Sequence, residues 1–188
     1  MSRTRDVQVR TQDFVTTCVS RKSGNPKIMT HSGGLAQPDA RAAGHLLAVL
    51  DERDNGTLVR VVCDLAAANR YSAASDGVRY DRVLAWVVTR IAEIIIEPLE
   101  WGPQEPAEYK VGFRTLDGHA VDFADAPPAV QCVVRAVTAE LADDSDSVGT
   151  ALEDADHASA SLRADILLEA LALLDRLLDA RLRHATAE

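Results

Sequence analysis

Acidic residues and a histidine, which are common metal ligands, gather in the segment 143–160. The densest group in it comprises Glu153, Asp154, Asp156 and His157. Carboxylate oxygens suit a divalent cation, but the segment lacks the glycine and the ligand spacing of an EF-hand loop. No HxxxH or HExxH pair occurs in the chain either. We therefore interpret the segment as a solvated acidic linker, and we predict no metal and no other cofactor.

The residue types of a thiol-based catalytic set are also present, as Cys63, Asp64 and His45. However, Cys63 lies in the apolar run Val61–Cys63, which favours a buried structural cysteine. The motifs GxSxG, SxxK, GxGxxG and GxxxxGK[ST] are all missing. The sequence therefore favours a protein that is not an enzyme, and it identifies no catalytic residue.

One pair of carboxylate motifs matches those of the all-helical nucleotide pyrophosphohydrolases in letters alone. Glu97 and Glu100 have ExxE spacing, and 153–156 has ExxD spacing. Pro98 prevents the first two carboxylates from sharing one helix face, and the two motifs are far apart. We interpret the match as chance. A small metal-dependent enzyme using carboxylates near 93–100 or 153–157 is our third hypothesis.

Charge is unevenly distributed along the 188 residues, whose formal net charge is −9. The first 30 residues are basic, and the rest of the chain is acidic. An acidic body repels the phosphate backbone of nucleic acids, so nucleic acid is not the favoured partner. A nucleic-acid-associated regulator is nevertheless the alternative hypothesis. Its contacts would be Arg3, Arg5, Arg10, Arg21, Lys22 and Lys27.

Cysteine usage and hydropathy favour a reducing compartment. The three cysteines, Cys18, Cys63 and Cys132, are far apart and form no CxxC pair, so we predict no disulfide framework. The longest apolar stretch, near Val83–Ile96, is too short and too often interrupted by charge to span a bilayer. No signal peptide follows Met1. We expect a cytoplasmic protein without membrane contact, and the excess of arginine over lysine suggests a bacterial or phage origin.

Apolar spacing predicts four long helices. The first covers 38–53 after Pro38, the second 80–97, the third 128–141 after Pro127, and the last 161–184 with Ser161 as its cap. The second is apolar on nearly every side, which is typical of a central helix. Between the second and third, Asp117–Gly118 joins two alternating segments, which predicts a β-hairpin at about 110–124.

Three other regions are less regular. Residues 12–20 have helical spacing, with Thr11 as a possible cap, and Val7 and Val9 before them suggest a strand fragment. Residues 21–37 are rich in Gly, Ser and Asn, which predicts a loop that is either functional or mobile. Thr57 can cap a helix over 58–70, which would form an antiparallel hairpin with the helix at 38–53, although 58–63 is β-branched enough for a strand. No internal repeat at a fixed period is apparent.

These elements predict a mainly helical α+β protein, an irregular helical bundle around a central apolar helix with one β-hairpin. We expect a basic arm and loop at 1–37, a core at 38–142, an acidic linker at 143–160 and a C-terminal amphipathic helix at 161–188. The apolar stripe of that last helix is wider than one surface requires. We therefore predict a scaffold or adaptor that binds protein, itself or another. Its contact residues would be Leu167, Leu171, Leu174 and Leu178.

Overall fold

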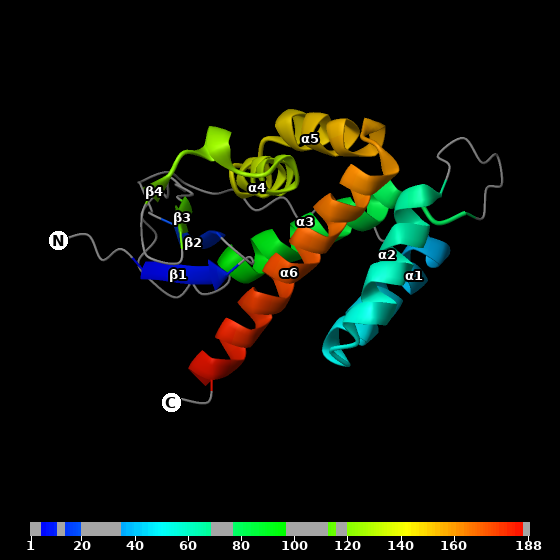
Figure 1. The fold of residues 1–188 in the computed structure, drawn as a ribbon, viewed down its shortest axis with the longest axis horizontal. Coiled ribbons are helices and arrows are strands. Elements are labelled where there is room, and N and C mark those ends of the chain that lie inside the picture. The colour runs from blue at the N-terminus through cyan, green and yellow to red at the C-terminus, as the bar shows by residue number, and fades with distance from the viewer. Residues whose placement is uncertain are drawn as a thin grey trace.

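The structure is a computed structural model of the chain. It describes residues 5–10, 14–19, 35–68, 77–96, 113–115 and 120–185. Figure 1 shows two helical hairpins beside two long helices, with strands at one end. The expectation of a mainly helical protein is confirmed.

The two hairpins are built alike. The first joins α1 (Gln37–Asp51) to α2 (Asn55–Ala67), and the second joins α4 (Pro128–Leu141) to α5 (Ser145–His157). A proline lies in the first turn of α1 and of α4, where its missing N–H costs no helical hydrogen bond. As predicted, helices therefore begin near Pro38 and Pro127.

The turns of the two hairpins also correspond residue by residue. Arg53 and Asp143 both have positive φ, at 58° and 56°. The next residue in each hairpin, Asp54 or Asp144, caps the second helix. Its carboxylate accepts a hydrogen bond from the backbone N–H of Thr57 at 3.0 Å or of Ser147 at 3.1 Å.

One constant interval in sequence separates each of these features from its counterpart. It relates Pro38 to Pro128, Arg53 to Asp143, Asp54 to Asp144 and Thr57 to Ser147. The two hairpins therefore correspond in turn geometry and capping, although few of their residues are identical. The expectation of no sequence repeat at a fixed period is not contradicted by this likeness. Below, a counterpart is the residue at the same place in the other hairpin.

Two long helices form the centre of the bundle. They are α3 (Tyr80–Ile96), as predicted from its apolar surface, and α6 (Ala160–Ala185). They pack on each other, α2 packs on α6, α1 and α5 pack on α3, and α4 packs on both. Side chains that are almost fully buried between them include Leu84, Val87, Ile91, Ile166, Leu167 and Leu171.

Four short strands are paired in the antiparallel order β1-β2-β3-β4. Their bounds are β1 Arg5–Arg10, β2 Phe14–Val19, β3 Phe113–Thr115 and β4 Ala120–Val121. The β1 strand agrees with the fragment expected around Val7 and Val9. The turn at Asp117–Gly118 lies outside the described residues, so the hairpin predicted over 110–124 stays a prediction as a whole.

Several sequence-based assignments are corrected by the structure. The helix expected at 12–20 is strand β2, because Phe14–Val19 pairs with β1 on one side and β3 on the other. The strand expected up to 124 ends at Val121. There Asp122 accepts a hydrogen bond from the backbone N–H of Ala124 and begins a 3-10 turn at Phe123–Asp125.

The largest correction concerns the segment 143–160. Most of it is helix α5 rather than a solvated linker, because Asp144 caps it and Ala151 and Ala155 are buried against the core. Alanine is a strong helix former, and Ala151 and Ala155, one turn apart, dock α5 on the core together with the partly buried Leu152.

Two caps and one ambiguity are also settled. Asp54, not Thr57, caps α2, and Ser159, not Ser161, caps α6 by accepting a hydrogen bond from the backbone N–H of Leu162 at 3.2 Å. Residues 58–63 belong to helix α2. Leu58, Val62 and Leu65 follow helical spacing and are buried, which explains the choice of helix over strand.

Candidate protein-interaction site

The leucines predicted to bind a partner on α6 mostly lie in the protein's own core. Leu167 and Leu171 are fully buried, Leu174 is 2% exposed, and Leu178 alone of the four is exposed, at 37%. The wide apolar stripe of α6 is covered by α2, α3 and α4. A partner could reach the first three leucines only if these helices separated.

Of the basic residues predicted to contact nucleic acid, the structure describes only Arg5 and Arg10. Arg5 and Arg10 begin and end strand β1. Arg3, Arg21, Lys22 and Lys27 lie outside the described residues.

The acidic residues proposed as metal ligands are spread around α5. Glu153 and Asp154 are exposed, and Asp154 lies 3.8 Å from the guanidinium of Arg135. Asp156 points toward the core and lies 3.7 Å from Arg163. Within the described ranges, no group of three His, Cys, Asp or Glu side chains is placed to hold a metal ion.

A buried carboxylate joins α1 to the start of α3. Asp39 is 1% exposed, and its Oδ1 accepts a hydrogen bond from the backbone N–H of Arg79 at 2.8 Å. Its other oxygen lies 3.5 Å from the guanidinium of Arg82. Backbone N–H groups at a helix start lack partners within the helix, so Asp39 satisfies one of them and fixes α3 against α1.

A second buried polar contact joins the starts of α3 and α6. The Tyr80 hydroxyl donates a 2.8 Å hydrogen bond to the carbonyl of Arg163, and the Arg163 guanidinium lies 4.4 Å from the centre of the Tyr80 ring. Burial raises the pKa of Tyr80 above its ordinary value. The phenol therefore stays protonated and serves as a structural donor, not as a general base.

The two cysteines whose side chains the structure describes have opposite surroundings. Cys132 is buried, and burial raises the pKa of its thiol, which disfavours the reactive thiolate. Cys63 is exposed on α2, so the expectation that it is a core residue is wrong. The apolar run Val61–Cys63 is helical, so its residues point in different directions, and Cys63 lies on the exposed side of α2.

The outer face of α2 is the clearest feature that packing within the chain leaves unexplained. We define it by four exposed residues with helical spacing, namely Gly56, Val59, Cys63 and Ala67. None carries a charge, and Val59 is one of three large apolar side chains exposed among the described residues, at 45%. Single exposed apolar residues are ordinary, but an uncharged row along an exposed helix is less so.

The equivalent face of α5 shows what this position looks like when it only contacts water. The counterparts of the four residues are Asp146, Gly149, Glu153 and His157, all exposed. Three of these four are polar or ionisable. The two faces therefore occupy the same place in matching hairpins but have different chemistry.

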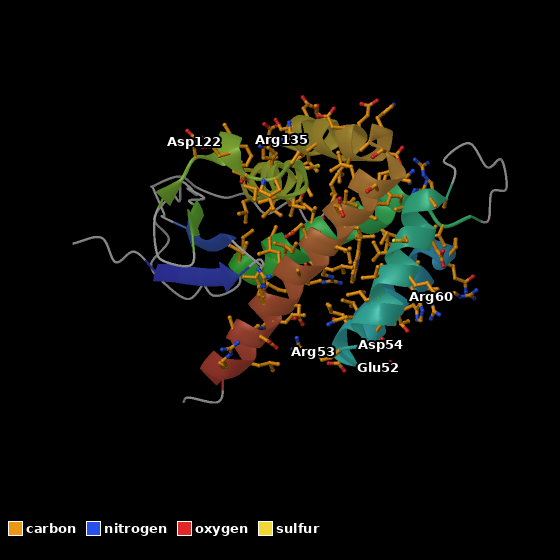
Figure 2. All side chains as sticks on the ribbon, viewed as in Figure 1. Glu52, Arg53, Asp54, Arg60, Asp122 and Arg135 are labelled. Atoms are coloured by element: carbon orange, nitrogen blue, oxygen red, sulfur yellow. The ribbon has the colours of Figure 1, made fainter. Side chains whose placement is uncertain are left out.

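One side of the outer face of α2 carries two opposite charges. Arg60 and Asp64 are both exposed and lie one helical turn apart. The Arg60 guanidinium donates a long, 3.4 Å hydrogen bond to the hydroxyl of Thr57. Figure 2 shows Arg60 on the side of the first hairpin that faces away from α6. The outer face of α2 is thus uncharged along its centre and electrically neutral along this edge.

The sequence did contain a signal for this face. Residues 58–67 hold two interleaved apolar series, Leu58–Val62–Ala66 and Val59–Cys63–Ala67. A helix can turn only one of them to a core on one side, so an apolar series on both sides indicates a second contact. We missed it because the sequence still allowed a strand over 58–63.

Comparison with known proteins provides no further identification. No protein-family model, no curated protein and no solved structure matches the chain. In the part of the chain that the structure describes, no helix is both long and apolar enough to cross a membrane.

Proposed function

We propose that this chain is a non-enzymatic protein-interaction module, and that it docks its partner on the outer face of α2. The observation that carries the proposal is the contrast between two matched positions. Gly56, Val59, Cys63 and Ala67 face outward from α2, where α5 has Asp146, Gly149, Glu153 and His157. A face that only contacts water gains nothing from exposed Val and Cys, whereas a docking face gains when they are buried.

This proposal places the partner contact on α2 rather than on α6, where the sequence predicted it. Three of the four leucines proposed there pack within the chain, so they explain the stability of the bundle rather than partner binding. A scaffold or adaptor role is retained, but with α2 as its contact element.

Site-specific photo-crosslinking tests this function. In a Cys18→Ser background, which removes the third thiol, a benzophenone maleimide placed on Cys63 would be compared with the same probe on a Cys63→Ser, Glu153→Cys variant, which carries it at the counterpart position of α5. We expect a protein adduct of one defined mass, identified by mass spectrometry, from position 63 but not from 153. The Val59→Asp variant labelled at Cys63 should lose it. Equal labelling from both positions, or no adduct from either, would exclude a docking function for α2.

The nucleic-acid alternative stays a prediction, because four of its six contact residues, namely Arg3, Arg21, Lys22 and Lys27, lie outside the described residues. It requires binding that weakens steeply with salt. A gel shift at low salt that shows no complex would exclude it.

A further inference from the structure

We infer that the partner on the outer face of α2 is a second copy of this chain, with the two α2 helices packed antiparallel across a two-fold axis near Cys63. This inference rests on the proposed function and identifies its partner. A two-fold contact requires a surface that complements itself, in which each residue meets a suitable residue of the other copy. The charges and the apolar residues of α2 both meet this requirement.

The charges fix the direction of the pair. In an antiparallel helix pair, the same edge of each helix meets its equivalent, whereas in a parallel pair opposite edges meet. Arg60 and Asp64 lie on the same edge of α2. An antiparallel pair therefore sets Arg60 beside Asp64 of the partner subunit, and the symmetry repeats this contact once. A parallel pair would leave both charges without an opposite charge from the other helix.

The order of the two charges within the chain also favours an intermolecular contact. An acidic residue four positions before a basic one forms the better ion pair on a single helix, and α2 has the reverse order. Among the described residues, Arg60 has a 3.4 Å hydrogen bond to the hydroxyl of Thr57 and a minor electrostatic attraction to Asp54, and both Arg60 and Asp64 are exposed. Arg60 and Asp64 are therefore available to a neighbouring molecule.

The apolar residues fit the same arrangement. An axis at Cys63 places Val59 of each copy beside Ala67 of the partner subunit, a larger residue against a smaller one. Gly56 lies at the end of the row and has no side chain that would obstruct a neighbouring helix there.

Charge also argues against other partners. Arg60 and Asp64 cancel, so the edge of α2 gives no net attraction to a strongly basic or strongly acidic protein. The equivalent face of α5 would repel a second copy of itself, because Asp146, Glu153 and Asp154 are all exposed there. Of the two matched faces, only that of α2 is compatible with self-association.

The size of the contact sets the expected affinity. Two helices that meet along three or four turns bury less surface than the roughly 1,200–2,000 Å² of a standard stable complex. We therefore expect a reversible dimer with a dissociation constant in the micromolar range.

Charge reversal measured by analytical ultracentrifugation tests the inference. In Arg60→Asp and in Asp64→Arg, the facing edges carry like charges, so each variant should dimerise at least about tenfold more weakly than wild type. The two variants mixed in equal amounts should form a heterodimer, and the double variant should regain the wild-type dissociation constant. Thr150→Asp, at the counterpart of Arg60 on α5, is the matched control and should not change the dimer.

Each other outcome is decisive. A wild-type chain that stays monomeric at several hundred micromolar, single variants that dimerise normally, or a mixture that does not recover would overturn the two-fold pairing. The photo-crosslink from Cys63 then separates the two proposals. If it identifies a different protein, the docking function stands and the second-copy inference falls. If it identifies nothing, both fall.

Discussion

The hairpins α1–α2 and α4–α5 have the same construction but face their surroundings differently. Both have a proline in the first turn, a residue with positive φ at the corner and an aspartate that caps the second helix. Both pack on the central helices α3 and α6. Outward, however, α2 has Val59 and Cys63, where α5 has Gly149 and Glu153.

This difference separates the positions whose residue type the fold depends on from the positions at which the fold tolerates other residue types. Corner and cap residues correspond because they set the backbone. The outward residues differ because the stability of the hairpin does not depend on them, and surface substitutions generally change stability by less than about 0.5 kcal/mol. A row of uncharged side chains along such a face, unlike a single exposed apolar residue, therefore indicates a contact outside the chain.

The largest expected effect on stability comes from placing the buried aspartate of the first hairpin at the equivalent position of the second. Ala129 is the counterpart of Asp39 and is 6% exposed. Ala129→Asp would bury a carboxylate among the apolar side chains of the core. An uncompensated buried charge costs about 3–5 kcal/mol, which urea denaturation would measure. Ala129→Asn is the uncharged control, and equal losses in the two variants would mean that the charge has a partner.

Replacing Asp39 by alanine, the residue at its counterpart position, should reduce the free energy of unfolding by a smaller amount. Asp39→Ala removes the acceptor of the Arg79 N–H and the charge beside Arg82. Leaving a buried donor unsatisfied costs about 1–3 kcal/mol in the free energy of unfolding. Asp39→Asn keeps an acceptor for Arg79 and should lose only part of this. If Asp39→Ala unfolds like wild type, the start of α3 does not depend on α1.

The sequence predicted what depends on local pattern and missed what depends on tertiary context. The helices at 38–53, 80–97 and 128–141 were predicted close to their bounds because a proline and a strong apolar face mark each one. Segment 143–160 was missed because only Ala151 and Ala155 are buried there, so its acidic composition outweighed a weak apolar face.

The candidate site was harder to predict for a related reason. The sequence correctly showed that α6 has more apolar surface than a surface helix needs, but not that α2, α3 and α4 cover it. On α2 the reverse occurred. Cys63 lies in an apolar run, so burial was expected, and only the helical phase fixed by the Asp54 cap turns it outward.

Glycine substitutions at the two corner residues, Arg53 and Asp143, should change stability by unequal amounts. Both have positive φ, which disfavours any residue with a Cβ. Asp143→Gly should therefore raise stability by up to about 1 kcal/mol. Arg53→Gly should give less or even a loss, because the Arg53 guanidinium also bonds Asp175 at 2.7 Å and Asp179 at 3.0 Å on α6. Thermal denaturation measures both, and an equal gain would mean that these ion pairs contribute nothing.

The smallest effect concerns the caps, where the two hairpins should behave alike. Hydrogen bonds from Thr57 and from Ser147 hold the pKa values of Asp54 and Asp144 below the ordinary 3.8. A carboxyl group whose pKa is lowered by folding stabilises the folded state above its unfolded pKa. That contribution is lost as the pH falls through the lowered value. Wild type should therefore lose stability below about pH 3.8, with similar contributions from the two caps.

Asparagine at either cap isolates this contribution, because an amide caps a helix about as well but does not titrate in this range. Asp54→Asn and Asp144→Asn should each make the melting temperature less dependent on pH between about 2 and 4, with little change at pH 7. Additive flattening in the double variant is expected, since the two caps belong to separate hairpins. If only one of the two variants makes the melting temperature less dependent on pH, the two caps contribute unequally to stability. The hairpins would then correspond in geometry alone.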